Sequence, residues 1–334
     1  EGPLSPQDNA YEAIKLIPKG GNIFEVISRY DDILTLEGRE GYEPGDTLEL
    51  IIPFLSAHAI TGQDTKEISD KARLVKGTKE IVKQLRSSNW KVYIISTSYQ
   101  QHAENIAKRV GLGDIMENVY CTHISFGEPT IVSLEEEIAE REMIKEAEKY
   151  ICNSLHSDRL YTGEKDREIK RYLDRFYRQV QKTKIGREIL QKMVVMGGIR
   201  KVRAIEDIAV RNGISLKDAV VVGDSITDYK MLGAVNSAEG LSIAFNANEY
   251  ALPYGTVGLA TTDMQDLWLI LKAWIYGGRE EVKRVVLQKE EEQTSNNKSY
   301  YHWLDGKNSE ELARVLEIHR GFRKLVRGEA AKLG

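Results

Sequence analysis

The chain has 334 residues, of which 41% are hydrophobic and 29% charged, so it is long enough for two domains or for one domain with a large insertion. Its formal net charge of −4 and pI of about 6.0 give no electrostatic reason to expect nucleic acid or an acidic membrane surface as a partner. Two cysteines, Cys121 and Cys152, form no CxxC pair, which argues against a disulfide framework and favours a cytoplasmic location. No apolar run is long enough to span a bilayer.

The predicted elements, taken in chain order, mostly alternate between helix and strand. Residues 8–73 are largely helical around a Gly/Pro-rich middle, "EGREGYEPGDT". A helix then leads to a buried strand at Val92–Ile95, followed by another helix and a strand in "NVYCTHISF". Residues 126–195 are highly charged and helical. After them come the helix "KVRAIEDIAVRNGI", the strand "AVVVG" and a strand at Leu241–Phe245. The chain ends with a polar linker and a last helix.

This alternation predicts an α/β fold with a central parallel sheet, decorated by helical insertions. The core is assigned to three stretches, residues 1–7, 74–125 and 196–278. The segments 8–73 and 126–195 interrupt the core and could cover a site. Residues 279–334 are predicted to form a helical C-terminal extension.

Two carboxylates follow the strand in "VVVGDSITD". Asp224 comes directly after Gly223, at the edge where ligands bind in parallel α/β sheets, and Asp228 lies one helical turn later. Two such oxygen donors suit Mg²⁺, which accepts one or two carboxylates together with a phosphate oxygen. Alternatively, both aspartates only cap the helix that follows them.

Hydroxyl groups and a lysine strengthen the first interpretation. The strand in "VYIISTS" ends in Ser96 and Thr97, whose hydroxyl and backbone N–H groups could bind a phosphoryl oxygen. Lys201 opens the helix that leads to the Asp224 strand and could neutralise phosphate charge. Each feature is weak alone, because Ser and Thr are common turn residues and most lysines are surface charges.

Taken together, these motifs resemble the haloacid dehalogenase (HAD) superfamily of phosphohydrolases, and most closely its phosphoserine-phosphatase-type members. That pattern is a DxD strand, a strand ending in Ser or Thr, a lysine, and a strand ending in GDxxxD. Ser96, Lys201 and "GDSITD" match the second, third and fourth motifs in order. The resemblance covers roughly residues 74–125 and 197–270, and implies a Rossmann-like core with helical caps.

The first motif has no good copy in the sequence. "RYDDILT" has adjacent acids instead of alternating ones, whereas "EGP" at Glu1–Pro3 resembles the end of the family's D-x-[DE]-G-[TP] loop. The resemblance therefore places the nucleophilic Asp two positions before Glu1, at the end of a strand that precedes the sequence. Glu1 stands where the family usually has Asp.

The resemblance implies a two-step phosphoryl transfer through an aspartyl phosphate. Glu1 would be the general acid and base, protonating the leaving alcohol and then activating water. Mg²⁺ would be bound by the upstream Asp, the Glu1 carbonyl and Asp224, with Asp228 as a ligand or through a water. The positions implied for phosphate binding are Gly2, Ser96, Thr97 and Lys201.

The two insertions lie where the family places its caps, 8–73 between the first and second motifs and 126–195 between the second and third. Arg29 and Tyr30 are candidate substrate contacts, as is Arg39, although all three could be ordinary surface residues. Three histidines show no metal-ligand spacing and are interpreted as structural or surface residues: His58, His102 and His123.

The sequence thus predicts a Mg²⁺-dependent phosphatase acting on a small phosphorylated metabolite. A phosphomutase or phosphotransferase would use the same residues and remains an alternative. A non-catalytic or regulatory binding protein of this fold is a second alternative, against which stands the joint presence of Ser96, Lys201, Asp224 and Asp228. A dehalogenase is less expected, because its reaction needs no Mg²⁺. The oligomeric state is left open.

Overall fold

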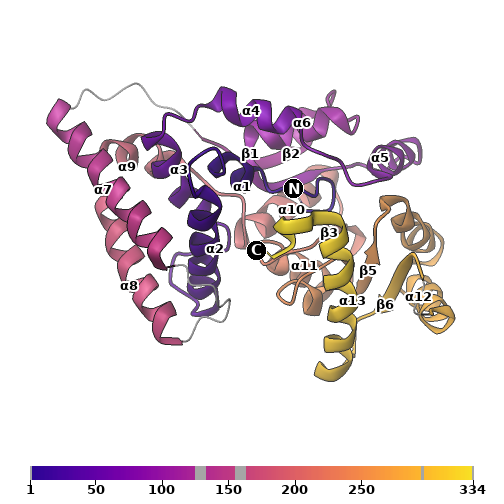
Figure 1. Ribbon diagram of the computed structural model, residues 1–334. Helices are drawn as coiled ribbons and strands as arrows, with labels where there is room; N and C mark the ends of the chain where they lie inside the picture. The colour runs from indigo at the N-terminus through magenta and orange to yellow at the C-terminus, as the bar shows by residue number, and fades with distance from the viewer. Residues whose placement is uncertain (1, 125–132, 155–162, 295–296, 333–334) are drawn as a thin grey trace.

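The computed structural model describes residues 2–124, 133–154, 163–294 and 297–332 (Figure 1). A strand-containing core lies beside a group of long helices, and both ends of the chain lie near the boundary between them. The predicted α/β class with helical additions is confirmed. Within the described ranges, no helix combines the length and apolarity needed to cross a membrane.

The strands of the core form two sheets. The smaller sheet pairs β1 (Ile94–Tyr99) in parallel with β2 (Val119–Thr122). The larger sheet has the order β3 (Val220–Gly223), β4 (Leu241–Phe245), β5 (Val257–Thr261) and β6 (Ser299–Trp303). Its first three strands are parallel, and β6 is antiparallel to β5. Every residue of β4 and β5 is buried, as expected for apolar strands covered on both faces.

Helices cover the strands with their apolar sides. The core helices are α5 (Thr78–Ser87), α6 (Gln100–Arg109), α10 (Ile199–Asn212), α11 (Tyr229–Ser237), α12 (Leu267–Glu292) and α13 (Ser309–Arg327). Short 3₁₀ turns lie at Met116–Asn118, Leu190–Lys192, Leu216–Asp218, Leu252–Tyr254, Met264–Asp266 and Gly328–Lys332. The α10 helix ends at Gly213, whose φ of +64° favours glycine.

A slot separates the two sheets. β1 and β3 share no backbone ladder among the described residues, and a cavity of about 610 Å³ lies between them. Apolar side chains from β1, β3, α5, α10 and α12 line it. The slot therefore has the apolar lining and the strand edges that an additional strand would need.

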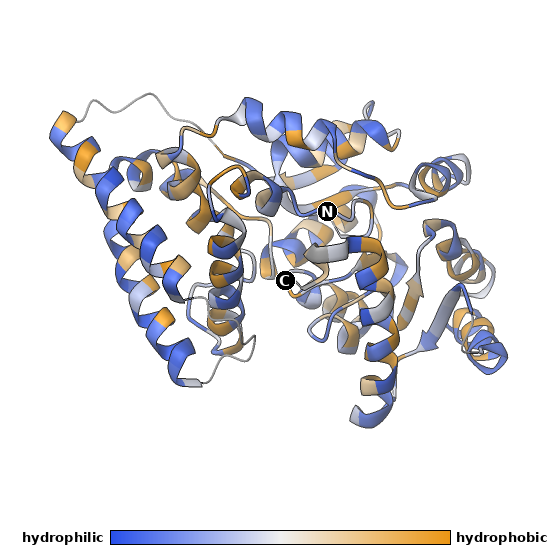
Figure 2. Cartoon of the chain, viewed as in Figure 1, coloured by the Kyte–Doolittle hydropathy of each residue, from blue (hydrophilic) through white to orange (hydrophobic). Residues whose placement is uncertain are grey.

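The remaining helices pack around one hydrophobic cluster, and we call them the helical body. They are α1 (Asn9–Ile14), α2 (Gly20–Leu36), α3 (Thr47–Ala57), α7 (Leu134–Ser154), α8 (Gly163–Val180) and α9 (Lys184–Glu188). Phe54 of α3 packs on Phe176 of α8 with ring centroids 5.6 Å apart. Figure 2 shows mainly hydrophilic colouring on the outward faces of α7 and α8. The two predicted insertions thus form one unit, while α4 (Gly62–Asp70) packs on α1 and α6.

Several element bounds differ from the sequence predictions. β1 continues through Ser96 to Tyr99, instead of ending at Ile95. Of the strand predicted in "NVYCTHISF", the described part is only Val119–Thr122, and residues 125–126 lie outside the described ranges. Among the described residues of the predicted C-terminal extension, β6 is a strand that pairs with β5 of the core sheet. A break at Gly277 and Gly278, where the backbone is not helical, divides α12.

Candidate active site

Asp224 and Asp228 lie together at the carboxyl end of β3. Asp228 precedes α11, and its Oδ2 accepts hydrogen bonds from the backbone N–H groups of Asp224 at 3.0 Å and Ser225 at 3.2 Å. Gly223 has no room for a Cβ, because the Asp228 side chain lies directly against it. The four-residue spacing and the glycine thus fold the loop so that Asp228 orients the backbone that carries Asp224.

Lys201 reaches this loop from the first turn of α10. Gly198, with a φ of +51°, precedes the helix and lets the chain turn into it. The Lys201 Nζ donates to Asp228 Oδ1 at 2.7 Å, and the two side chains are only 5% and 8% exposed. Both oxygens of Asp228 are therefore engaged, by a lysine and by backbone N–H groups, and a charge pair in this position is shielded from water.

Ser96 and Thr97 reach the same place from β1. The register of β1 against β2 shifts between Ile95 and Tyr99, so that Ser96 and Thr97 lie in a bulge. The Ser96 Oγ accepts a hydrogen bond from the backbone N–H of Ser98, which positions the hydroxyl. The buried Thr97 Oγ1 has no hydrogen-bond partner among the described residues. Ser96 and Thr97 line the same cavity as Asp224.

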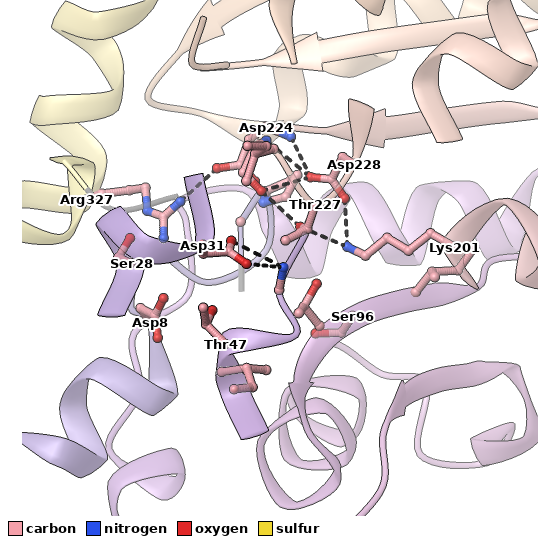
Figure 3. Close-up of a pocket in the computed structure, with 18 of the residues that line it drawn as sticks. Asp8, Ser28, Asp31, Thr47, Ser96, Lys201, Asp224, Thr227, Asp228 and Arg327 are labelled. Atoms are coloured by element: carbon pink, nitrogen blue, oxygen red, sulfur yellow. Dashed lines mark hydrogen bonds and ion pairs between the residues drawn. The ribbon is translucent and has the colours of Figure 1, made fainter. Parts of the chain in front are cut away.

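These groups line a cavity of about 130 Å³ between the core and the helical body (Figure 3). The structure brings together six residues predicted from the sequence: Gly2, Ser96, Thr97, Lys201, Asp224 and Asp228. Glu1, the predicted acid and base, lies outside the described residues. In Figure 3, Lys201 and Arg327 approach the aspartates from opposite sides.

Arg29 and Tyr30, the predicted substrate contacts, do not line this cavity. Arg29 forms an ion pair with Asp166 of α8 at 2.7 Å. The Tyr30 hydroxyl donates to Asp174 of α8 at 2.6 Å, and Arg39 pairs with the same carboxylate. These side chains hold α2 to α8 inside the helical body, away from the aspartate loop.

The three histidines lie in contacts consistent with their structural interpretation. His58 pairs with Glu148 at 2.8 Å, which joins α3 to α7. His102 is buried, and its Nδ1 lies 3.1 Å from the Ser69 hydroxyl. His123 lies 2.9 Å from Gln100 through its Nδ1. None of the three lines the cavity.

A loop of the helical body closes over the cavity. Asp31 of α2 accepts hydrogen bonds from the Gly45 backbone N–H at 3.0 Å and from the Tyr42 hydroxyl at 2.5 Å. Glu43 binds the Lys230 Nζ at 2.8 Å and the Ile199 backbone N–H at 2.8 Å. The loop is thus attached both to α2 and to the core helices α10 and α11.

Gly45 makes the closest approach of this loop to the site. Its φ of +96° favours glycine, and a Cβ there would meet the methyl groups of Thr97 and Thr227. Next to it, Asp46 pairs with Arg200 of α10 at 2.5 Å. The Gly/Pro-rich stretch of the sequence therefore contributes Gly45 to the wall of the cavity and is tied to α10 through Asp46.

The carboxylates of the site differ in their protonation. Burial tends to raise the pKa of Asp224, but the neighbouring Arg323 and Arg327 charges outweigh burial and hold this pKa below its ordinary value. Burial raises the pKa of Asp31 to about 6, although hydrogen bonds from Tyr42 and Gly45 oppose the increase. Asp224 is therefore ionised at neutral pH, whereas Asp31 titrates near it.

A divalent cation would find only part of its ligand set in the described chain. Within the ranges that the structure describes, no cluster of three or more His, Cys, Asp or Glu side chains is placed to hold a metal. Asp224 Oδ1 accepts no hydrogen bond from the described residues, and it faces Gly2 so closely that no Cβ would fit there. Asp224 is thus the available carboxylate, and Asp228 is placed to orient the loop.

Sequence reasoning missed several residues of the cavity. Asp31 carried a signal, since it is one of two adjacent acids on an otherwise amphipathic helix. Thr227 lies inside the recognised motif, where only the two aspartates were singled out. Arg327 lies 103 positions from Asp224, and nothing local to either residue indicates their contact.

Comparisons with known proteins agree with these observations. A model of haloacid dehalogenase-like hydrolases matches residues 26–149, and a second model with the same description matches residues 117–253. The chain belongs to the haloacid dehalogenase superfamily of hydrolases, which confirms the resemblance seen in its motifs. Ser96 lies in the first matched region, and Lys201, Asp224 and Asp228 lie in the second. No curated protein matches the chain.

The chain is also similar to solved structures, and the first of them shares its fold over the whole chain. The structure of a gene product from Archaeoglobus fulgidus is 27% identical, with a TM-score of 0.80, and the match covers 100% of this chain and 96% of that one. An intermediate analogue of phosphoserine phosphatase is 15% identical, with a TM-score of 0.49 and coverage of 79% and 92%. A substrate-bound phosphoserine phosphatase is also 15% identical, with a TM-score of 0.45 and coverage of 80% and 92%.

Proposed function

We propose that the protein is a Mg²⁺-dependent phosphatase that hydrolyses a small phosphorylated metabolite through an aspartyl-phosphate intermediate. The observation that carries this proposal is the convergence of Ser96, Thr97, Lys201, Asp224 and Asp228 on one small cavity. These residues come from three separate core elements, and their donors and charges suit a phosphoryl group. A cavity of about 130 Å³ under a closed loop favours a small substrate.

The described residues would bind and orient the phosphoryl group. The Ser96 hydroxyl and the backbone at Thr97 would donate hydrogen bonds to its oxygens, and the Lys201 ammonium would offset their charge. Asp228 holds Lys201 Nζ at 2.7 Å, which keeps the ammonium at the edge of the cavity. The loop around Gly45 would exclude water from the reacting group.

The nucleophile would come from an extended segment in the slot between β1 and β3. The slot and the site cavity share lining residues, among them Pro3, Ile95, Ser96 and Val222, so the slot ends at the site. This supports the expectation that an Asp two positions before Glu1 lies beside Ser96 and Asp224. Its carboxylate oxygen would form a bond to phosphorus while the ester P–O bond breaks and the alcohol leaves with a proton. Water would then release phosphate and regenerate the carboxylate.

Asp224, and the upstream Asp expected beside it, would hold Mg²⁺, whose charge would offset the charge that develops on the phosphoryl oxygens. Asp224 suits this role because it is ionised and its Oδ1 accepts no hydrogen bond from the described residues. Asp228 would keep the Asp224 backbone in place. The role of Glu1 as proton donor stays a prediction from its place in the motif.

The test is an assay on a generic aryl phosphate, using a chain extended before Glu1 by an apolar strand that ends in Asp at the expected position. We expect turnover with Mg²⁺ and none with EDTA. Asp224→Asn should reduce turnover by about 10²–10³-fold, which is the typical loss for one electrostatic group of an active site. An extension that carries Asn instead of Asp should be inactive.

A matched control is Asp70→Asn, which removes an exposed carboxylate paired with Lys66 and should leave turnover unchanged. Circular dichroism would show that each variant is folded. Turnover that persists in EDTA and in Asp224→Asn would contradict the proposed function.

A further inference from the structure

Two arginines from the C-terminal helix contact the central carboxylate of the site. Arg323 and Arg327 lie four residues apart on α13, and therefore on one face of the helix. The Nη1 atoms of Arg323 and Arg327 lie 2.5 Å and 2.8 Å from Asp224 Oδ2. All three side chains are buried. One carboxylate oxygen thus has two guanidinium partners, while the other oxygen has none among the described residues.

The two arginines differ in how firmly they are held. Arg323 also donates to the backbone carbonyls of Asp224 at 3.1 Å and Ala331 at 3.0 Å, so several contacts fix its guanidinium. Arg327 lines the site cavity, and its one hydrogen-bonded partner among the described residues is Asp224. Its Nε is buried without a hydrogen-bond acceptor in the described part of the chain. Arg323 is therefore held in place by several contacts, whereas Arg327 has N–H groups that no described residue accepts.

The position of Arg327 favours an anion in the cavity. In Figure 3 its guanidinium and the Lys201 ammonium approach the aspartates from opposite sides. A phosphoryl group bound between them would have a cation on either side, and guanidinium groups bind phosphate through paired N–H donors. The Asp224 carboxylate competes with that anion for Arg327, just as Arg327 competes with a metal ion for Asp224.

We propose that Arg327 is an anion-binding residue that exchanges partners. It is paired with Asp224 in the free protein, and it turns to the phosphoryl group of the substrate when a divalent cation takes the Asp224 carboxylate. The identity of cation and anion rests on the proposed function. The exchange leaves Arg323 in place to hold the Asp224 backbone, and it makes the C-terminal helix part of the substrate site.

The test measures two affinities that should move in opposite directions. Calorimetry would titrate the chain extended before Glu1, as used in the phosphatase assay, with Mg²⁺ alone and then with inorganic phosphate at saturating Mg²⁺. In Arg327→Gln we expect Mg²⁺ to bind about 3–10-fold more tightly, because a competing cation is gone. Phosphate should bind about 10–100-fold more weakly, because charge-assisted hydrogen bonds are lost.

Two further variants separate this role from a structural one. Arg327→Lys keeps the charge, so Mg²⁺ affinity should stay near that of the parent, with phosphate binding partly retained. Arg320→Gln removes an exposed arginine of the same helix that pairs with Glu317, and it should change neither affinity. Weaker binding of both ligands in Arg327→Gln, or unchanged Mg²⁺ affinity, would overturn this proposal alone. A parent chain that binds neither ligand would overturn it together with the proposed function.

Discussion

The aspartate loop of the core and the helical body that covers it are stabilised in different ways. At the core, Lys201 and Asp228 form a pair whose side chains are 5% and 8% exposed. In the helical body, Arg29 and Asp166 form a pair whose side chains are 32% and 16% exposed, around a large apolar cluster. The ion pair at the aspartate loop is therefore shielded from water, whereas the Arg29–Asp166 pair lies partly exposed at the rim of the helical body and should contribute less to stability.

The carboxylates of the two regions show the same contrast. Asp224 is buried against two arginines, and its pKa lies below the ordinary value. Asp32 of α2 is largely buried, and its Oδ1 has no hydrogen-bond partner among the described residues. Burial raises the pKa of Asp32 to about 7, and the charge of Asp31 adds to the increase. Asp224 thus stays charged at neutral pH, whereas Asp32 is about half protonated there.

The largest effect on stability is expected from breaking the core pair. Lys201→Met leaves the Asp228 charge buried without its cation, and should lower the free energy of unfolding by about 3–5 kcal/mol. Adding Asp228→Asn to the same variant should restore most of the loss, because no unpaired charge remains. Urea denaturation of the two variants measures both values.

Lys66→Met is the matched control, since Lys66 pairs with Asp70 on the surface with a side chain 57% exposed. It should change stability by less than about 1 kcal/mol. A similarly small loss in Lys201→Met would show that the core pair is no more important than a surface pair.

A pH-dependent effect is expected from Asp32. Because its folded pKa is raised from 3.8 to about 7, the folded state holds this proton more tightly, and stability falls as pH rises between these values. Asp32→Asn should therefore be more stable than the parent by about 1–3 kcal/mol at pH 8, and equal to it near pH 3.5. Thermal unfolding across this pH range measures the difference.

Asp70→Asn removes a half-exposed surface carboxylate and provides the matched comparison for this experiment. If Asp32→Asn were no more stable than the parent at pH 8, the result would contradict this prediction. It would show that the environment of Asp32 in solution does not disfavour its charge.

The smallest effect is expected at the rim of the helical body. Arg29→Gln removes a partly exposed ion pair with Asp166, and should lower stability by no more than about 1 kcal/mol. Because Arg29 does not line the cavity, KM for the aryl phosphate should change less than about twofold, as no substrate contact is lost. A tenfold increase in KM with unchanged kcat would instead indicate that Arg29 contacts the substrate, as predicted from the sequence.

The core strands and the superfamily motifs could be predicted from the sequence because each of them is local. Gly223, Asp224 and Asp228 lie within six positions, and the apolar strand before them has a recognisable composition. The order of Ser96, Lys201 and Asp224 along the chain was enough to identify the superfamily. Strand ends were less predictable, since the bulge in β1 depends on its pairing with β2.

Contacts between distant segments required the tertiary structure. The sequence predicts residues 8–73 and 126–195 as two separate caps, but apolar residues of both pack into one hydrophobic cluster. An amphipathic pattern shows which face of a helix is apolar, but not which other helix that face will contact. The same limit applied to Arg29 and Tyr30, which bind α8. Residue type alone sets charge and hydrogen-bonding capacity, so the sequence was enough to establish which groups are candidates for chemistry. Only the fold decided which of them meet, as Arg327 and Asp224 do across 103 positions, because that depends on the packing of whole helices.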